Sequence, residues 1–256
     1  MRMAETPKPL DLKPETVLFY KGYVREAEAT MEGTLGDADG SFLWADNDPK
    51  ILEQVRRGDV PAQSLAAKGS VAAPSGVIHD WIAAAFVPDA TVAGLIGRLQ
   101  DYDNHKDIYT DVIESKLISR KGNDFKIYLR LLKKKIITIV LDTDHDVHYT
   151  QLDDARWCLR SCTTRIAEVD NPGRPTENVR PADTGFGYLW RLYSYWRFFE
   201  RDAGVYLECR AISLTRDIPA GLGWIVQPIL RSLPKEALIS TLKNTCDAAL
   251  LAGIEP

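Results

Sequence analysis

An acidic segment and four histidines are the first side chains whose spacing could do chemistry. The segment DTDHDVHYTQLD begins at Asp142 and places three aspartates at alternate positions, as a calcium-binding loop does. Its sixth residue is Val147, where such a loop needs glycine, and its flanks read as strands rather than helices. Residues 142–146 are therefore expected to form a solvated acidic turn without calcium.

The histidines do not suggest a shared metal site. His145 and His148 are three residues apart, which on a strand places them on opposite faces. His79 is polar within the apolar run VIHDWIAAAFV, where a hydrogen-bonded core histidine is the commoner outcome, and His105 stands alone. We expect no metal and no cofactor.

The cysteines and the usual catalytic motifs give no active site. Cys158 and Cys162 lie about 13 Å apart along a strand, beyond the reach of a disulfide. Cys209 is about 9–10 Å away if the strands are sequential neighbours, and Cys246 is on a helix. The chain has no nucleophile elbow, phosphate-binding loop, dinucleotide fingerprint or zinc-protease motif, so no catalytic residue is predicted.

Charged residues within apolar strand-like runs are the remaining candidates for chemistry. Alternation favours the solvent face of a one-sided sheet for them, and the polar wall of a cavity is the alternative. Strand register decides between the two, because a one-residue bulge reverses every assignment. These residues are Arg130, Arg160, Arg165, Arg191, Arg197, Glu208 and Arg210.

The composition describes an ordinary globular protein. The 256 residues are 45% hydrophobic and 27% charged, with a net charge of −4, which argues against a generic nucleic-acid binder. No apolar window reaches the roughly 18 residues of a membrane span. The first 15 residues lack the apolar core of a signal peptide. A cytoplasmic location is expected of the sequence as it stands, and a secreted or periplasmic one if a signal peptide was removed.

The periodicity predicts helices at both ends and strands between them. Helical spacing is found at 16–31, 49–57, 90–100, 104–109 and 235–251, the last preceded by an apolar segment broken by Pro228 and Pro234. Strand-like runs cover 77–87, 112–119, 124–132, 136–141, 147–152, 156–169, 186–200 and 204–216. Residues 171–185 read as a loop. Helices segregated from a meandering sheet indicate the α+β class.

This order of elements resembles the START-related, or SRPBCC, helix-grip superfamily of lipid-transfer and polyketide cyclase-like proteins, and a group of bacterial members in particular. The resemblance covers 66–256 and rests on the segments 94–120 and 204–245. It implies a curved antiparallel sheet of about seven strands around a long C-terminal helix, with an apolar cavity between them. Residues 1–65 form a mainly helical extension outside the resemblance.

The resemblance also turns particular residues into candidates for the cavity. Alternate aromatic residues of the run 186–199 become cavity wall, and Tyr102 and His105 are placed near its mouth. The complete set of candidate ligand-binding residues is His79, Trp81, Tyr102, Arg130, Arg165, Trp190, Trp196, Phe198 and Glu208.

Three functions remain open. The first is binding or transport of a lipid, sterol-like or polyketide-like molecule, entering near 87–110 or 219–234. The second is an aromatase/cyclase-like enzyme, with His79, Arg130, Arg165 and Glu208 as its first suspects. The third is a protein-interaction module in which residues 1–65 cover the cavity mouth or form a dimer contact. The partner expected under the first is a hydrophobic small molecule, while oligomeric state and transient membrane contact stay open.

Overall fold

The computed structural model describes residues 9–35, 42–134, 138–217 and 223–252. Within them, one antiparallel sheet holds ten strands in the order β2-β4-β12-β11-β8-β7-β6-β5, with β3 beside β4 and β9 beside β8. Its seven long strands are β4 (Gly76–Pro88), β5 (Val112–Lys121), β6 (Asp124–Lys134), β7 (Thr138–Gln151), β8 (Arg156–Asp170), β11 (Arg191–Arg201) and β12 (Gly204–Arg216). The short ones are β2 (Ala62–Ser64), β3 (Val71–Ala73) and β9 (Asn178–Val179), and β1 (Leu10–Asp11) pairs with β10 (Thr184–Gly185) separately.

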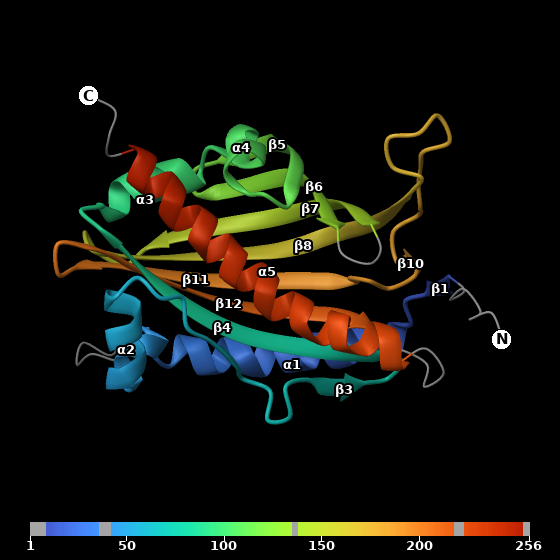
Figure 1. Cartoon of the computed structure of the whole chain (residues 1–256), viewed down its shortest axis with the longest axis horizontal. Coiled ribbons are helices and arrows are strands. Elements are labelled where there is room, and N and C mark those ends of the chain that lie inside the picture. The colour runs from blue at the N-terminus through green and yellow to red at the C-terminus, as the bar shows by residue number, and fades with distance from the viewer. Residues whose placement is uncertain (1–8, 36–41, 135–137, 218–222, 253–256) are drawn as a thin grey trace.

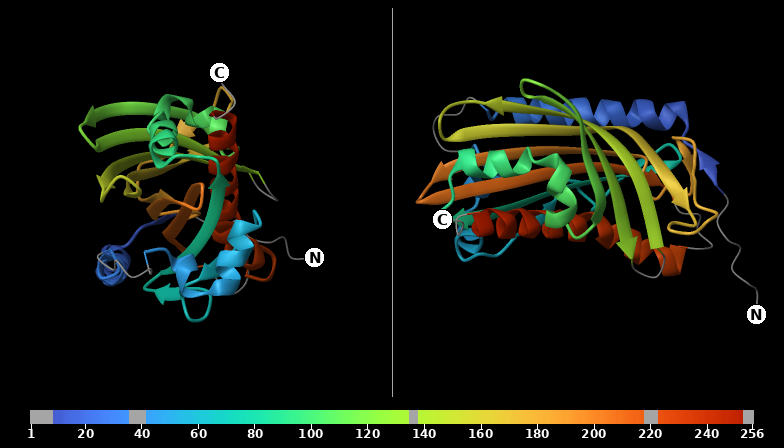
Figure 2. Two further views of the ribbon diagram at one scale, coloured as in Figure 1. Left: turned by 90° about the vertical axis from the view of Figure 1, so that its left-hand side faces the viewer. Right: turned by 90° about the horizontal axis from the view of Figure 1, so that it is seen from above.

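Helices cover both faces of the sheet. The long C-terminal helix α5 (Gly223–Ala252) crosses one face diagonally, and α1 (Pro14–Glu32) lies against the other (Figure 1). Figure 2 shows the curved sheet lying between α1 and α5. Here the α5 side is called the inner face and the α1 side the outer face. The α+β helix-grip fold expected from the sequence is confirmed, and no described helix is long and apolar enough to cross a bilayer.

The shorter helices lie at one end of the sheet, where β4 ends and β11 turns into β12 (Figure 1). Near the outer face lie η1 (Trp44–Asn47) and α2 (Pro49–Arg56), the latter capped by the Asp48 side chain. Between β4 and β5 the chain forms α3 (Val92–Leu99), η2 (Tyr102–Asn104) and α4 (His105–Ile108). Thr91 caps α3 by accepting a hydrogen bond from the Gly94 amide.

Helix α5 begins earlier than the sequence suggests. The two prolines predict a break, yet the helix is continuous from Gly223 through Pro228 and Pro234. A proline inside a helix costs about 3 kcal/mol. Packing against the sheet offsets that cost, because Leu238 and Leu242 are buried in the main core against β4 and β12.

Residues 142–146 do not form the expected turn, because β7 runs straight through them. Three aspartates at alternate positions all point to the outer face, where cross-strand basic residues pair with them. Asp142 and Asp146 pair with side chains of β6, and Asp144 with one of β8. The two histidines of this strand lie on opposite faces, as predicted, with His145 buried and His148 exposed.

The outer face is covered rather than solvated around β11 and β12. Tyr20 and Val24 of α1 pack with Ile212 and Leu214 of β12. The Tyr20 hydroxyl donates a hydrogen bond of 2.8 Å to the Ile212 carbonyl. Farther along β12, Tyr206 is buried with residues 42–45. The N-terminal extension therefore completes a second core on the face opposite α5.

The four cysteines are free thiols. Cys209 lies in the main core, and burial raises the pKa of Cys158 and of Cys162 to about 11. Such thiols carry little thiolate at neutral pH and are poor nucleophiles.

Candidate functional site

A cavity of about 330 Å³ lies between the inner face of the sheet and α5. Alternate residues of β6, β7, β8, β11 and β12 form its floor, and one side of α5 forms its roof. The floor is mainly apolar: Ile127, Leu129, Leu131, Ile139, Leu141, Val147, Leu159, Leu192, Trp196, Cys209 and Ala211. The roof consists of Leu233, Pro234, Ala237, Leu238, Thr241 and Asn244.

Small side chains in the middle of the floor account for the space. Ser161 of β8, Ser194 of β11 and Ala211 of β12 are neighbours across three adjacent strands. A curved sheet cannot contact a straight helix along its whole length, so short side chains at the widest point leave a gap. Protein cores otherwise pack as densely as organic crystals, and a gap of this size is not ordinary core.

Aromatic rings close the end of the cavity near α3 and α4. The Tyr102 and Tyr149 hydroxyls form a hydrogen bond of 2.7 Å, and Phe125 packs edge-on against Tyr149. His105 Nε2 donates to the Leu99 carbonyl at 3.0 Å. Burial lowers the pKa of His105 to about 4, so its imidazole is neutral at physiological pH.

A second histidine lies on the floor itself. His145 places Nδ1 3.2 Å from Ser161 Oγ and Nε2 2.9 Å from Thr143 Oγ1. Burial lowers the pKa of His145 to about 4, so this imidazole is also neutral. The charged residues among the described lining are Asp111 and Lys133, which pair with each other. The cavity thus offers neutral hydrogen-bonding groups within an apolar wall.

The predicted site residues fall into two groups, and the first lies on the inner face. Tyr102 and Trp196 line the cavity, and Phe198 stacks on Trp196 with ring centroids 6.0 Å apart. His79 and Trp81 share this face on β4 but lie outside the cavity lining. His79 Nε2 is 3.2 Å from Thr215 Oγ1, so it is a hydrogen-bonded core histidine.

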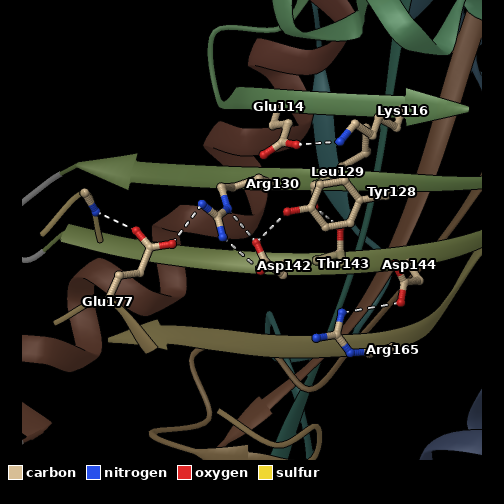
Figure 3. A network of polar contacts seen from close by, with 11 residues as sticks. Glu114, Lys116, Tyr128, Leu129, Arg130, Asp142, Thr143, Asp144, Arg165 and Glu177 are labelled. Carbon is tan, nitrogen blue, oxygen red and sulfur yellow. Dashed lines mark hydrogen bonds and ion pairs between the residues drawn. The ribbon is translucent and has the colours of Figure 1, made fainter. Parts of the chain in front are cut away.

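Arg130 and Arg165 lie on the outer face and do not line the cavity (Figure 3). The guanidinium of Arg130 binds both carboxylate oxygens of Asp142, at 2.7 and 3.1 Å, and the Tyr128 hydroxyl donates to the same carboxylate. Arg165 pairs with Asp144 at 3.4 Å. Alternation explains the position of Arg130, because its neighbours on β6 point into the cavity.

Trp190 and Glu208 are also on the outer face, so neither lines the cavity as a ligand-binding residue would, and Glu208 is buried rather than in the solvent that alternation favoured for it. Trp190 precedes the first residue of β11 and belongs to the buried cluster that Tyr20 and Val24 of α1 form with β12. Glu208 accepts a hydrogen bond from the Trp44 amide and lies 3.9 Å from Arg197 Nε. Both are therefore part of the contact with the N-terminal extension.

Because Glu208 is buried, we expect the stability of the folded protein to depend on pH. Burial raises the pKa of Glu208 to about 7, against about 4.3 for a free glutamate. Between these values the folded chain holds a proton that the unfolded chain has released, so stability falls as pH rises. Glu208→Gln should therefore stabilise the protein by on the order of 2 kcal/mol at about pH 8 and change little at about pH 4.

Urea unfolding of both proteins at the two pH values measures this difference. Glu177→Gln is a matched control, because that glutamate pairs with Arg130 in a partly exposed position away from the extension. A pH profile that is the same for Glu208→Gln and the unsubstituted chain would contradict the prediction.

Sequence reasoning missed the polar floor of the cavity. Because residues 142–146 were expected to form a turn, His145 was not assigned to a strand. In the structure it lies on β7 and pairs with Thr163 of β8. Alternation puts Ser194 on the core-facing side of its strand, but the pairing that brings it beside Ser161 depends on register. The available signal was the alternation of small residues, Ser194 on one strand and Ala211 with Ser213 on the next.

No protein-family model and no curated protein matches this chain. Solved structures do. TTHA0849 from Thermus thermophilus aligns with a TM-score of 0.49 and 14% identity over 67% of this chain and 97% of its own. Human STARD10 aligns with a TM-score of 0.46 and 14% identity over 79% of this chain and 80% of its own. The Zhui aromatase/cyclase from Streptomyces sp. R1128 aligns with a TM-score of 0.47 and 13% identity over 68% of this chain and 94% of its own. These similarities concern the fold, and function has to be judged from the cavity.

Proposed function

We propose that this protein binds and carries a hydrophobic small molecule, such as a lipid, a sterol-like or a polyketide-like compound, in the cavity beneath α5. The observation that supports this most is the cavity itself, about 330 Å³ in volume and lined mainly by apolar side chains. Ligand pockets in proteins range from about 300 to 1,000 Å³ and combine apolar walls with a few polar groups. The lining has this composition, since its wall is mainly apolar, its hydrogen-bonding groups are mostly neutral, and its charged residues Asp111 and Lys133 pair with each other.

The alternative of a cyclase-like enzyme has less support. The four residues suspected from the sequence do not converge, because Arg130, Arg165 and Glu208 are on the outer face while His79 is on the inner face. The alternative of an interaction module has a different difficulty. The side of α1 that carries Tyr20, Val24 and Ala27 already packs on the sheet, on the face opposite the cavity, although Leu18 and Phe19 are exposed.

We place the ligand entrance at the seam between α5 and the segment that follows α4. Asn244 lines both the cavity and a polar surface depression that also includes Arg98 and Asp107. Hydrogen bonds join the two sides of this seam. Asn244 Nδ2 donates to Thr110 Oγ1 at 3.3 Å, and the Tyr109 and Thr245 hydroxyls are 3.1 Å apart. Separation of these two pairs would open the cavity at this end.

A disulfide across this seam should slow ligand exchange. In the double variant Thr110→Cys/Asn244→Cys, the oxidised protein should take up and release ligand at least about tenfold more slowly, because a covalent link cannot open as two weak hydrogen bonds can. The reduced form of the same variant is the control and should exchange at the original rate. Equal rates in both forms, with the disulfide verified by mass spectrometry, would place the entrance elsewhere.

Native mass spectrometry tests the proposed function. The full-length protein, delipidated and then incubated with a total lipid extract, should retain apolar molecules at one per chain. Absence of any retained mass would overturn the proposal.

A further inference from the structure

A chain of hydrogen bonds on the cavity floor fixes which atoms carry protons. Thr143 Oγ1 donates to the Leu129 carbonyl at 2.9 Å, because a carbonyl can only accept. The single hydroxyl proton of Thr143 is thereby used. Thr143 Oγ1 must then accept at its other contact, so His145 Nε2, 2.9 Å away, carries a proton.

The orientation of His145 in turn fixes that of Ser161. A neutral imidazole has one protonated nitrogen, so Nδ1 of His145 is an acceptor. Its partner at 3.2 Å is Ser161 Oγ, which donates its only proton. The side of Ser161 that faces the cavity therefore presents lone pairs and no proton.

Several other polar groups of the wall also have their protons committed, whereas the Tyr102–Tyr149 pair leaves one phenolic proton uncommitted. Thr241 and Thr245 each donate to a backbone carbonyl of α5 at 2.9 Å, so Tyr109 must donate to Thr245. His105 donates through Nε2 to Leu99, which leaves Nδ1 unprotonated. These groups can accept hydrogen bonds from a ligand, but their protons are already used within the protein.

Ser194 is the complementary group next to Ser161. It stands directly opposite Ser161 in the pairing of β8 with β11, and such side chains have Cβ atoms about 4.5–5.5 Å apart. Its hydroxyl has no hydrogen-bond partner among the described residues, so it can donate or accept. A hydroxyl placed between the two serines can donate to Ser161 and accept from Ser194.

We propose that the ligand is an uncharged hydrophobic alcohol or phenol whose hydroxyl group binds between Ser161 and Ser194. This inference rests on the proposed function. A ketone of the same frame can accept from Ser194 but leaves the lone pairs of Ser161 unmatched. A carboxylate would bring a negative charge to an acceptor-rich wall, where the lining cation, Lys133, is already paired with Asp111.

Three steroids with one carbon frame test this selectivity: androstanol, androstanone and androstane, which carry a hydroxyl, a carbonyl and neither group. Each is titrated from cyclodextrin into the delipidated full-length chain, and the dissociation constants are compared. The alcohol should bind about tenfold more tightly than the ketone, the effect of one hydrogen bond in a dry site.

Substitutions identify the atoms responsible. Ser161→Ala should remove the advantage of the alcohol over the ketone. His145→Leu should also reduce that ratio about tenfold, but by tightening the ketone, because Ser161 regains a free proton. Ser213→Ala is the matched control, since Ser213 lines the cavity but pairs with Leu192 rather than with Ser161. It should leave the ratio unchanged.

The possible outcomes distinguish failure of the hydroxyl site from failure of the proposed function. Equal binding of alcohol and ketone by the unsubstituted chain would overturn the hydroxyl site while leaving a hydrophobic cavity in place. A ratio unaffected by both Ser161→Ala and His145→Leu would do the same. Failure of all three steroids to bind would count against the proposed function itself, and against the inference with it.

Discussion

The Ala211→Trp variant is expected to lose ligand binding while remaining folded. Ala211 lies on the floor of the cavity on β12, beside Ser194. An indole at this position fills space that the ligand would occupy. If it displaces roughly 100 Å² of ligand contact, the loss at about 25 cal/mol per Å² is about 2.5 kcal/mol, or roughly a hundredfold in affinity. Titration of androstanol into both proteins measures the effect.

An exposed position provides the control for this substitution. Ile113 on β5 is 46% exposed, so Ile113→Trp adds the same side chain without entering the cavity. It should bind ligand as the unsubstituted chain does. The melting temperature of Ala211→Trp should stay the same or rise, because the added ring fills an existing gap rather than an occupied core. Undiminished binding by Ala211→Trp would contradict the placement of the ligand beneath α5.

The second large effect is on stability and concerns the outer face. Asp80 of β4 is fully buried, and its carboxylate pairs with Arg210 at 2.6 and 3.0 Å. The Tyr23 hydroxyl of α1 donates to the same carboxylate at 2.8 Å. Asp80→Ala leaves a mostly buried guanidinium without its charge partner, which costs about 3–5 kcal/mol. For a chain of this size we expect the melting temperature to fall by roughly 10 °C.

A double variant separates loss of the charge pair from loss of packing. Asp80→Leu/Arg210→Met removes both charges and fills the space with apolar groups, a replacement that is often neutral in cores. It should therefore recover most of the stability lost in Asp80→Ala, by thermal unfolding at neutral pH. An Asp80→Ala protein as stable as the original would mean that the N-terminal extension is not anchored through this pair.

The main elements of the fold could be predicted because their periodicity is local. The runs that became β4, β6, β8 and β12 alternate or are continuously apolar, and the turn Lys121–Asp124 fixes one hairpin. The helix that covers the sheet was visible from its apolar stripe, although its true start at Gly223 was not. There, tertiary packing overrides the helix-breaking tendency of proline.

Side-chain orientation could not be predicted where register breaks. Arg165 has the same odd parity as Leu159 and Ser161, both of which line the cavity. An irregularity in the pairing of β7 with β8, next to His145, shifts the register so that Arg165 stands opposite Asp144 on the outer face. This irregularity falls at Thr163–Arg165, where no glycine marks a bulge in the sequence, yet it decides whether a charge faces ligand or solvent.

The cover that residues 1–65 place over β12 was not predicted from that strand. Tyr206, Glu208 and Ile212 lie on one side of this strand, and all three are buried although α5 covers the other side. In the sequence this side is mixed, because Glu208 and Arg210 alternate with Tyr206 and Ile212, and alternation therefore favoured solvent for it. What the sequence did not reveal is that α1 supplies the cover, since its packing on the sheet joins residues nearly two hundred positions apart.

A crystal structure of the full-length chain with androstanol bound tests the central claim most directly. We predict electron density for the steroid within the cavity beneath α5, in contact with Trp196, and its hydroxyl within hydrogen-bond distance of Ser161 and Ser194. Density on the outer face or on the surface, with the space above Ala211 filled by side chains of the protein, would contradict it.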